Sequence, residues 1–153
     1  MNDTLQMFHT SISKTLTMLM SDIDNCPMEL WEKKVGGDFY WQQIYHAFAS
    51  LHLFLKDDSS QELPLSENAA DLKGNFTGGT PTKQLVKQVG QMVMRHTERY
   101  FESIHPDMLA TKLNFFDNVV PLSDILMMCC THLSYHLGLC DGALRDAGAK
   151  AAM

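Results

Sequence analysis

The stretch PLSDILMMCCTHLSYHLGLCDGALRDAG, residues 121–148, indicates which fold this chain adopts. It opens with a proline suited to the first turn of a helix, and Gly148 at its end is a natural helix terminator. Apolar residues and two histidines recur along it at helical spacing: Cys129, His132, Leu133, His136, Leu137 and Cys140. Positions three and four apart share one side of an α-helix, so the stretch predicts a long helix with one buried face.

Three further segments show helical patterns of apolar residues. In residues 3–23, apolar side chains recur every three or four positions. Residues 39–57 (FYWQQIYHAFASLHLFLKD) are apolar around most of the helix circumference and follow Asp38, a candidate N-cap. Residues 80–104 open with a threonine cap and carry Pro81 in the first turn. Each segment therefore predicts one long helix.

Together the four helices predict an all-α fold, a four-helix bundle formed as one domain over residues 1–153. Residues 58–80, between the second and third helices, are polar and rich in glycine, serine and asparagine, which predicts a long surface loop. Residues 111–118 (TKLNFFDN) are interpreted as a shorter loop before the fourth helix. No run alternates between apolar and polar residues as strands do, so we expect helices and loops alone.

The composition is that of an ordinary globular domain, with 45% hydrophobic and 20% charged residues. The net charge is −6 and lysine and arginine form no cluster, so we expect no nucleic-acid partner. No apolar run approaches the roughly 20 residues that span a bilayer, and the first residues do not resemble a signal peptide. We therefore expect a cytoplasmic protein with no membrane partner. Its four cysteines lack disulfide spacing and are expected to be reduced thiols.

His132 and His136 lie four positions apart in the fourth predicted helix, so their side chains point from the same face one turn apart. Such a pair can bind one metal ion, or one ring can be a hydrogen-bonded core group while the other is exposed. Cys140 and Cys129 share this face and could approach a metal, although packing as small apolar residues is the simpler interpretation. A metal site would need a further ligand from another segment.

Five other histidines are candidates for that ligand. His46 has the most apolar neighbours, and the pattern alone favours it only slightly over His52, which lies nearer the end of the same predicted helix. His96 lies among charged residues and is expected to be solvated. His9 lies near the start of the chain, and His105 precedes a proline in an expected exposed turn. The pattern therefore does not choose firmly between the two histidines of the second helix.

Three segments resemble the DinB-like (damage-inducible) family of metal-binding four-helix bundles. FYWQQIYHAFASLHLFL, residues 39–55, is similar to the second helix of that family, which runs into a Tyr-His pair. Residues 80–104 are similar to its third helix, and THLSYHLGLCDGALRDAG, residues 131–148, is similar to its ending, two histidines followed by Leu-Arg-x-x-Gly. The resemblance covers most of the chain in the right order. It implies a metal triad of His46, His132 and His136.

The resemblance also implies a type of chemistry. Three neutral imidazoles on a divalent metal, whether zinc, nickel or iron, leave an open coordination position. Characterised relatives include thiol-dependent S-transferases, and others resemble metal-dependent hydrolases, so a small thiol or an electrophilic substrate is the expected partner. The alternatives are a non-catalytic metal- or ligand-binding bundle of the stress-response type, a dimeric scaffold without metal, and haem binding.

Two further expectations concern the surroundings of the triad and the oligomeric state. Each ligand imidazole needs an acceptor on its other nitrogen, and Gln42, Gln43 and Glu98 are available. The first two predicted helices are apolar over a wide arc, from which we expect a homodimer. The sequence does not indicate which face would form its interface.

Overall fold

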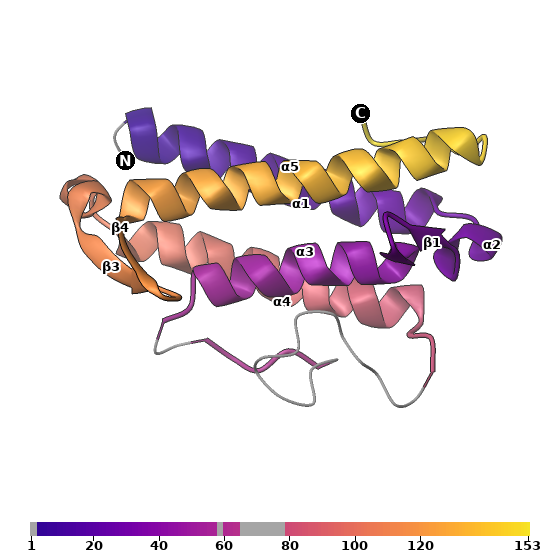
Figure 1. The fold of residues 1–153 in the computed structure, drawn as a ribbon, viewed down its shortest axis with the longest axis horizontal. Coiled ribbons are helices and arrows are strands. Elements are labelled where there is room, and N and C mark those ends of the chain that lie inside the picture. The colour runs from indigo at the N-terminus through magenta and orange to yellow at the C-terminus, as the bar shows by residue number, and fades with distance from the viewer. Residues whose placement is uncertain (1–2, 58–59, 65–78) are drawn as a thin grey trace.

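The computed structural model describes residues 3–57, 60–64 and 79–153. Four long helices run alongside one another in it (Figure 1) and confirm the predicted helical bundle. Their bounds are α1 Asp3–Asn25, α3 Tyr40–Phe54, α4 Lys83–Ser103 and α5 Leu122–Asp146. Most of the predicted 58–80 loop lies outside the described residues, and residues 60–64 and 79–82 contain no helix or strand.

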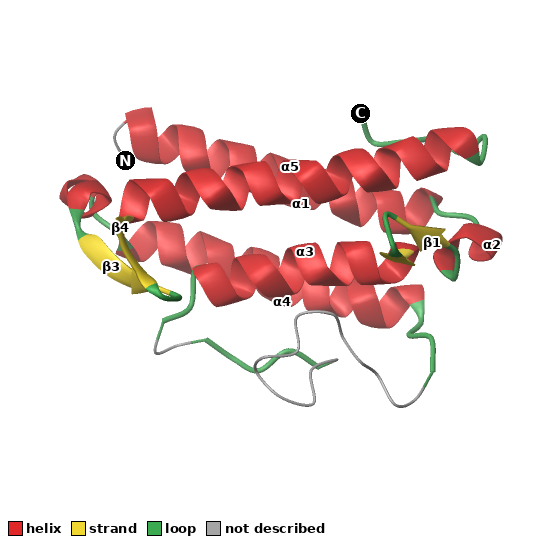
Figure 2. Cartoon of the chain, viewed as in Figure 1, coloured by secondary structure: helices red, strands yellow, loops and turns green. Residues whose placement is uncertain are grey.

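Short elements connect the long helices at both ends of the bundle. After α1 come the single turn α2 (Met28–Trp31) and the hairpin of β1 (Lys34–Val35) and β2 (Asp38–Phe39). After α4 come the 3-10 helix η1 (Pro106–Ala110) and the hairpin of β3 (Lys112–Phe115) and β4 (Asn118–Pro121). Figure 2 shows these two hairpins at opposite ends of the bundle.

The expectation of helices and loops alone is therefore wrong at the two hairpins. Strands β3 and β4 pair antiparallel, with Leu113 opposite Val120, and Phe116 makes the tight turn between them with a positive φ of 50°. Strands of two or four residues are too short to show a period of two in the sequence, and backbone hydrogen bonds alone define them.

Two helix starts also differ from the sequence prediction, whereas the predicted end of α5 is confirmed. Asp38 is not the cap of α3 but lies in β2, and α3 begins at Tyr40. Helix α4 begins two residues after Pro81, because Thr82 Oγ1 accepts the Leu85 N–H at 3.2 Å as its N-cap. Helix α5 ends as expected, since Gly148 adopts a positive φ of 71° just beyond it.

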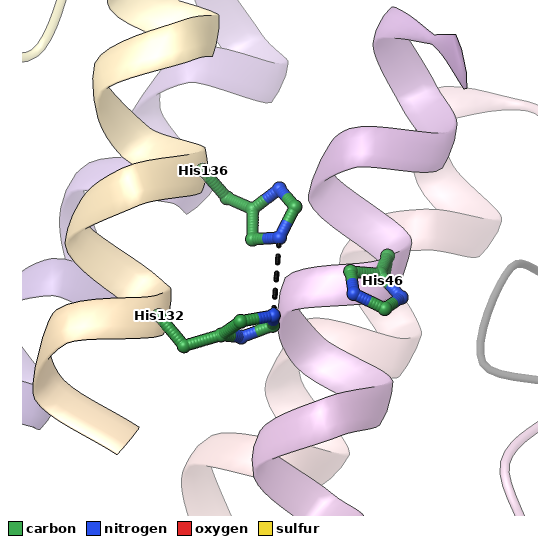
Figure 3. Close-up of side chains that lie close together, drawn as sticks. All are labelled: His46, His132 and His136. Carbon is green, nitrogen blue, oxygen red and sulfur yellow. Dashed lines mark hydrogen bonds between the residues drawn. The ribbon is translucent and has the colours of Figure 1, made fainter. Parts of the chain in front are cut away.

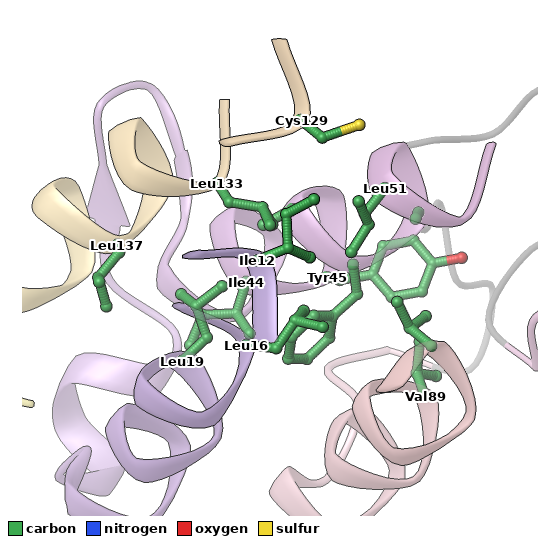
Figure 4. Close-up of a cluster of buried hydrophobic side chains, with 14 of the residues drawn as sticks. Ile12, Leu16, Leu19, Ile44, Tyr45, Leu51, Val89, Cys129, Leu133 and Leu137 are labelled. Carbon is green, nitrogen blue, oxygen red and sulfur yellow. The ribbon is translucent and has the colours of Figure 1, made fainter. Parts of the chain in front are cut away.

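The core lies along the axis of the bundle, where all four long helices contribute apolar side chains (Figure 4). Because the buried positions recur three and four apart on each helix, burying these faces together is the main stabilising contribution to the fold. Labelled members are Ile12, Leu16 and Leu19 from α1, Ile44 and Leu51 from α3, Val89 from α4, and Leu133 and Leu137 from α5. No helix in the described part of the chain has the length and apolar character to cross a membrane.

Gly90 allows α4 to approach its neighbours closely, and alanine there should destabilise the protein. An added Cβ would lie 2.5 Å from Met20 Sδ and 2.8 Å from Phe48 Cε2, and the Phe48 ring is fully buried. Overpacking of this kind costs about 1–3 kcal/mol, which equals or exceeds the gain of about 1 kcal/mol in helix propensity. Urea unfolding should show a loss for Gly90→Ala and a gain for Gly142→Ala, whose Cβ meets nothing within 4 Å. Equal stability of the two variants would contradict this packing argument.

Candidate metal centre

Three histidines from two helices meet in the middle of the bundle (Figure 3). His46 lies halfway along α3, and His132 and His136 lie one turn apart on α5. Each offers one ring nitrogen, and these three nitrogens lie within 4.8 Å of one another. The ring centroids are separated by 4.6 Å for His132–His136, 4.9 Å for His46–His136 and 5.1 Å for His46–His132.

The spacing of the two α5 histidines fits a shared ion. Their Nε2 atoms lie 3.3 Å apart (dashed line in Figure 3). Two nitrogens bonded to one cation at about 2.0–2.1 Å with a tetrahedral angle between them would be about 3.3–3.4 Å apart. Without a cation, one of the two nitrogens must carry the hydrogen that lies between them. The donor set and its spacing are therefore compatible with a metal ion.

Gln43 fixes the protonation of His136. The Gln43 side-chain Nε2 donates to the backbone carbonyl of Val35 in β1 at 2.6 Å, so its Oε1 is turned toward the site. That oxygen accepts from His136 Nδ1 at 2.8 Å, and both side chains are buried. Because Nδ1 carries the proton, Nε2 presents a lone pair to the centre of the triad. Gln43 was one of three candidates for such a role, whereas Gln42 caps α3 and Glu98 lies on α4 against His9.

Ser50 is a partner of the site that the sequence analysis missed. Its hydroxyl lies 3.3 Å from His46 Nε2, one turn further along α3, and the serine is fully buried. The tautomer of His46 decides whether this hydroxyl donates to the ring nitrogen or accepts from it. The spacing of four residues on one helix was the available signal, since it places the two side chains on one face.

Burial keeps the two imidazoles of α5 neutral. The pKa of His136 is lowered to about 3, chiefly by burial and then by the neighbouring His132 and His46. The pKa of His132 is also lowered, first by burial and then by His46. A neutral imidazole is the form that ligates a cation, so the apolar surroundings already favour the ligand form near neutral pH.

Aromatic side chains border the exposed side of the cluster. His46 and His132 are half-buried, whereas His136 is only 6% exposed, so access is from the side of the first two rings. The Phe54 ring lies 5.7 Å from that of His132, and Phe115 and Phe116 of the β3–β4 hairpin pack against Phe54. The hairpin that the sequence did not predict therefore forms one apolar border of the site.

The remaining histidines lie elsewhere. The expectation that His96 is solvated is wrong, because it is 2% exposed and its Nε2 donates to the Leu55 carbonyl. His52 bonds to the Gln61 carbonyl and contacts His96. His105 is exposed as predicted, and His9 pairs with Glu98 on the outside of α1 and α4.

The cysteines do not join the cluster. Of the side chains that the structure describes, only the three histidines form a group of three or more that could hold a metal. Cys129 and Cys140 are buried, and burial raises the pKa of the Cys129 thiol to about 12. Both therefore pack as small apolar residues, the simpler of the two interpretations.

Comparison with solved structures agrees with this architecture. No protein-family model matches the sequence, and no curated protein matches it. The crystal structure of a DinB-like protein from Bacillus cereus ATCC 10987 superposes with a TM-score of 0.63, covering 94% of this chain and 93% of that one. The chain has a DinB-like fold. Sequence identity is 16%, so the likeness establishes the DinB-like fold and not the chemistry.

Replacing Gln43 by leucine should weaken metal binding without removing a ligand. Loss of the Oε1 acceptor frees the tautomer of His136, and losing such a partner costs about 10–100-fold in metal affinity. Zinc titrations should therefore give a Kd raised by that factor, with His136 still present. Gln91→Leu makes the same chemical change on an exposed face of α4 and should leave the Kd unchanged. An unaltered Kd for Gln43→Leu would show that the Gln43 contact does not position His136.

Proposed function

We propose that His46, His132 and His136 hold a divalent cation, zinc, nickel or iron, and that the protein is an enzyme acting on a small thiol or an electrophilic substrate. The observation that carries this proposal is the meeting of three ring nitrogens from α3 and α5 within 4.8 Å. Three neutral ligands do not offset the charge of a divalent ion, and sites with three protein ligands keep a position for water or substrate.

The chemistry follows from that charge and that position. When bound, such a cation would lower the pKa of a thiol or water placed on it, which suits S-transfer from a thiol or hydrolysis. The chain's own residues would hold the site in shape. Gln43 retains the proton on His136 Nδ1, and Phe54 with the β3–β4 hairpin keeps water from one side of His132. Their apolar surfaces also suit an apolar electrophile.

A turnover assay tests the proposal. Full-length protein loaded with zinc, nickel or iron is mixed with monobromobimane and with cysteine, glutathione or another low-molecular-weight thiol. In the expected reaction the sulfur–carbon bond forms, the carbon–bromine bond breaks, bromide leaves with the electron pair, and the thiol proton goes to the buffer. We expect consumption above the uncatalysed rate only with metal and thiol together. A parallel ester assay detects hydrolysis.

Two variants test whether the turnover depends on the triad. His132→Ala should abolish the metal-dependent rate, and His105→Ala, at an exposed histidine outside the site, should retain it. Turnover that survives His132→Ala would overturn the assignment of the triad. If no thiol or ester is turned over although metal binds stoichiometrically, the alternative holds, a non-catalytic metal- or ligand-binding bundle.

The proposal also places the protein in the cytoplasm as a homodimer, as the sequence analysis expects. Exposed apolar side chains on the long helices, such as Met7 on α1 and Met127 on α5, are compatible with a second copy docking there. Sedimentation velocity at micromolar concentration tests the dimer directly. A single species with the 17.3 kDa mass of one chain would rule it out.

A further inference from the structure

A second pair of histidines lies apart from the triad, between α3 and α4. His52 is in the last turn of α3, and His96 is in the middle of α4. Their ring centroids are 4.8 Å apart, with the planes inclined at 64°. His96 is 2% exposed and His52 is half-buried, so the pair lies at the border of the core.

Backbone carbonyls fix the tautomer of both rings. His52 Nε2 donates to the Gln61 carbonyl at 2.7 Å, and His96 Nε2 donates to the Leu55 carbonyl at 2.8 Å. A carbonyl oxygen only accepts, so each Nε2 carries the proton and each neutral ring has a bare Nδ1. This is the arrangement found in metal-bound histidines, where one nitrogen donates to a carbonyl and the other ligates.

Neither Nδ1 has a hydrogen-bond partner among the described residues. Both atoms are buried, and no residue in the described parts of the chain forms a hydrogen bond with either. A buried acceptor without a donor costs about 1–3 kcal/mol, so two such atoms on touching rings require a physical explanation. A bound species between them would remove that cost.

We propose that His52 and His96 form a second metal-binding site, in which their two Nδ1 atoms ligate one divalent transition-metal cation and water completes the coordination. Imidazole nitrogen suits zinc, copper, iron and nickel. The 4.8 Å ring separation falls within the 4.6–5.1 Å range of the histidine triad. With two protein ligands in place of three, this site should bind more weakly than the triad.

The ring separation is compatible with a cation bound between the two rings. If each Nδ1 lone pair is directed at a cation bonded at about 2.0–2.1 Å, the cation lies about 3.2 Å from each ring centroid. With the centroids 4.8 Å apart, the centroid–cation–centroid angle is then about 97°. That angle lies between the octahedral and tetrahedral values. A water hydrogen-bonded at about 2.8 Å to both Nδ1 atoms would have the two rings at about 75°, which bends each hydrogen bond only slightly, so the zinc measurements below decide between the two species.

The charges around the pair are compatible with this role. Burial lowers the pKa of His52, so the ring is held in its neutral, ligating form. The positive charge of Lys56 lowers that pKa further, whereas the carboxylate of Asp57 raises it and would attract a cation. His52 is half-buried, so the pair lies next to the surface on its side, with both Nδ1 atoms themselves buried.

The test uses zinc as the probe and a chain from which the first site has been removed. His46→Ala with His132→Ala eliminates the triad, and elemental analysis after dialysis against low micromolar zinc should still find one equivalent per chain. Adding His52→Gln should then raise the Kd for zinc by at least about tenfold. Glutamine keeps an amide that can donate to the Gln61 carbonyl, and His105→Gln makes the same change at an exposed histidine.

A spectroscopic measurement on the unmodified protein complements the variants. In long-range 15N–1H spectra of histidine rings, zinc beyond one equivalent should shift the Nδ1 signals of His52 and His96 while both Nε2 remain protonated. The proposal is overturned if the triad-free chain retains no zinc, if His52→Gln leaves its zinc content unchanged, or if these Nδ1 signals do not move. Since the triad is absent from the first experiment, its result does not depend on the proposed function.

Discussion

Replacing His132 by alanine should remove the thermal stabilisation that zinc gives to the protein. A ligand that binds only the folded state adds about 2.7 kcal/mol when its free concentration is about 100 times the Kd. For a protein of this size, each kcal/mol moves the Tm by about 2–4 °C, so the wild type should gain roughly 5–11 °C. Without His132, two ligands remain at the triad and most of this gain should disappear.

The measurement needs a metal buffer and a matched variant. Free zinc is held near about 100 times the Kd of the triad. At that concentration the proposed weaker site at His52 and His96 has a lower zinc occupancy than the triad. His105→Ala should keep the full shift, because that side chain is exposed and remote from the triad. Without zinc, His132→Ala should melt close to the wild type, since the half-buried ring forms only one hydrogen bond with the described residues, to His136. A full zinc shift in His132→Ala would exclude His132 as a ligand.

The sequence predicted the bundle and the paired histidines because both follow from helical periodicity. The same spacing that marks the buried face of α5 also places His132 and His136 one turn apart. The third member was harder to find. Helix α3 is apolar around most of its surface, so the pattern favoured His46 only slightly over His52, and the family resemblance decided between them.

His96 shows how neighbours in sequence can mislead. Its charged neighbours suggested solvation, but the buried positions Val89, Val93 and His96 follow one another at intervals of four and three. The face of the helix, not the adjacent residues, decides burial. That spacing is present in the sequence and predicts that His96 is buried.

Other parts of the site depend on contacts that no local pattern contains. Gln43 orients His136 only because the Val35 carbonyl in the β1–β2 hairpin binds its amide nitrogen. Likewise, Phe115 reaches Phe54 because the β3–β4 hairpin folds back on the end of α3. Both depend on strands too short to leave a pattern, so partners of this kind need a three-dimensional structure.

A buried pair of carboxylates should contribute a loss of stability between mild acid and mild alkali. Asp22 of α1 and Asp141 of α5 are 0% and 1% exposed, and both accept the backbone N–H of Ala152, at 3.1 and 2.9 Å. Burial, and then the charge of Asp141, raises the pKa of Asp22 from 3.8 to about 7. The nearby Arg145 and the Ala152 N–H offset only part of this rise.

The direction of the effect follows from proton binding. Between about pH 4 and pH 7, folded Asp22 retains a proton that the unfolded chain releases. The corresponding stability is present at low pH and is lost as the pH rises through about 7. From pH 5 to pH 8.5 this group should remove about 1–3 kcal/mol from the free energy of unfolding. The buried histidines act in the opposite direction below about pH 6.5, so a variant must isolate Asp22.

Asp22→Asn is that variant, because the amide has nearly the same shape and never ionises. Its oxygen can still accept from Ala152, and its nitrogen can donate to the facing carboxylate of Asp141. Urea unfolding should show that the change in the free energy of unfolding from pH 5 to pH 8.5 is more favourable in Asp22→Asn than in the wild type, by about 1–3 kcal/mol. Asp24→Asn, on the exposed side of the same helix, should leave the difference as in the wild type. Parallel pH profiles for the wild type and Asp22→Asn would mean that Asp22 is already ionised in the folded protein, and that Ala152 and Arg145 together outweigh the burial of its charge.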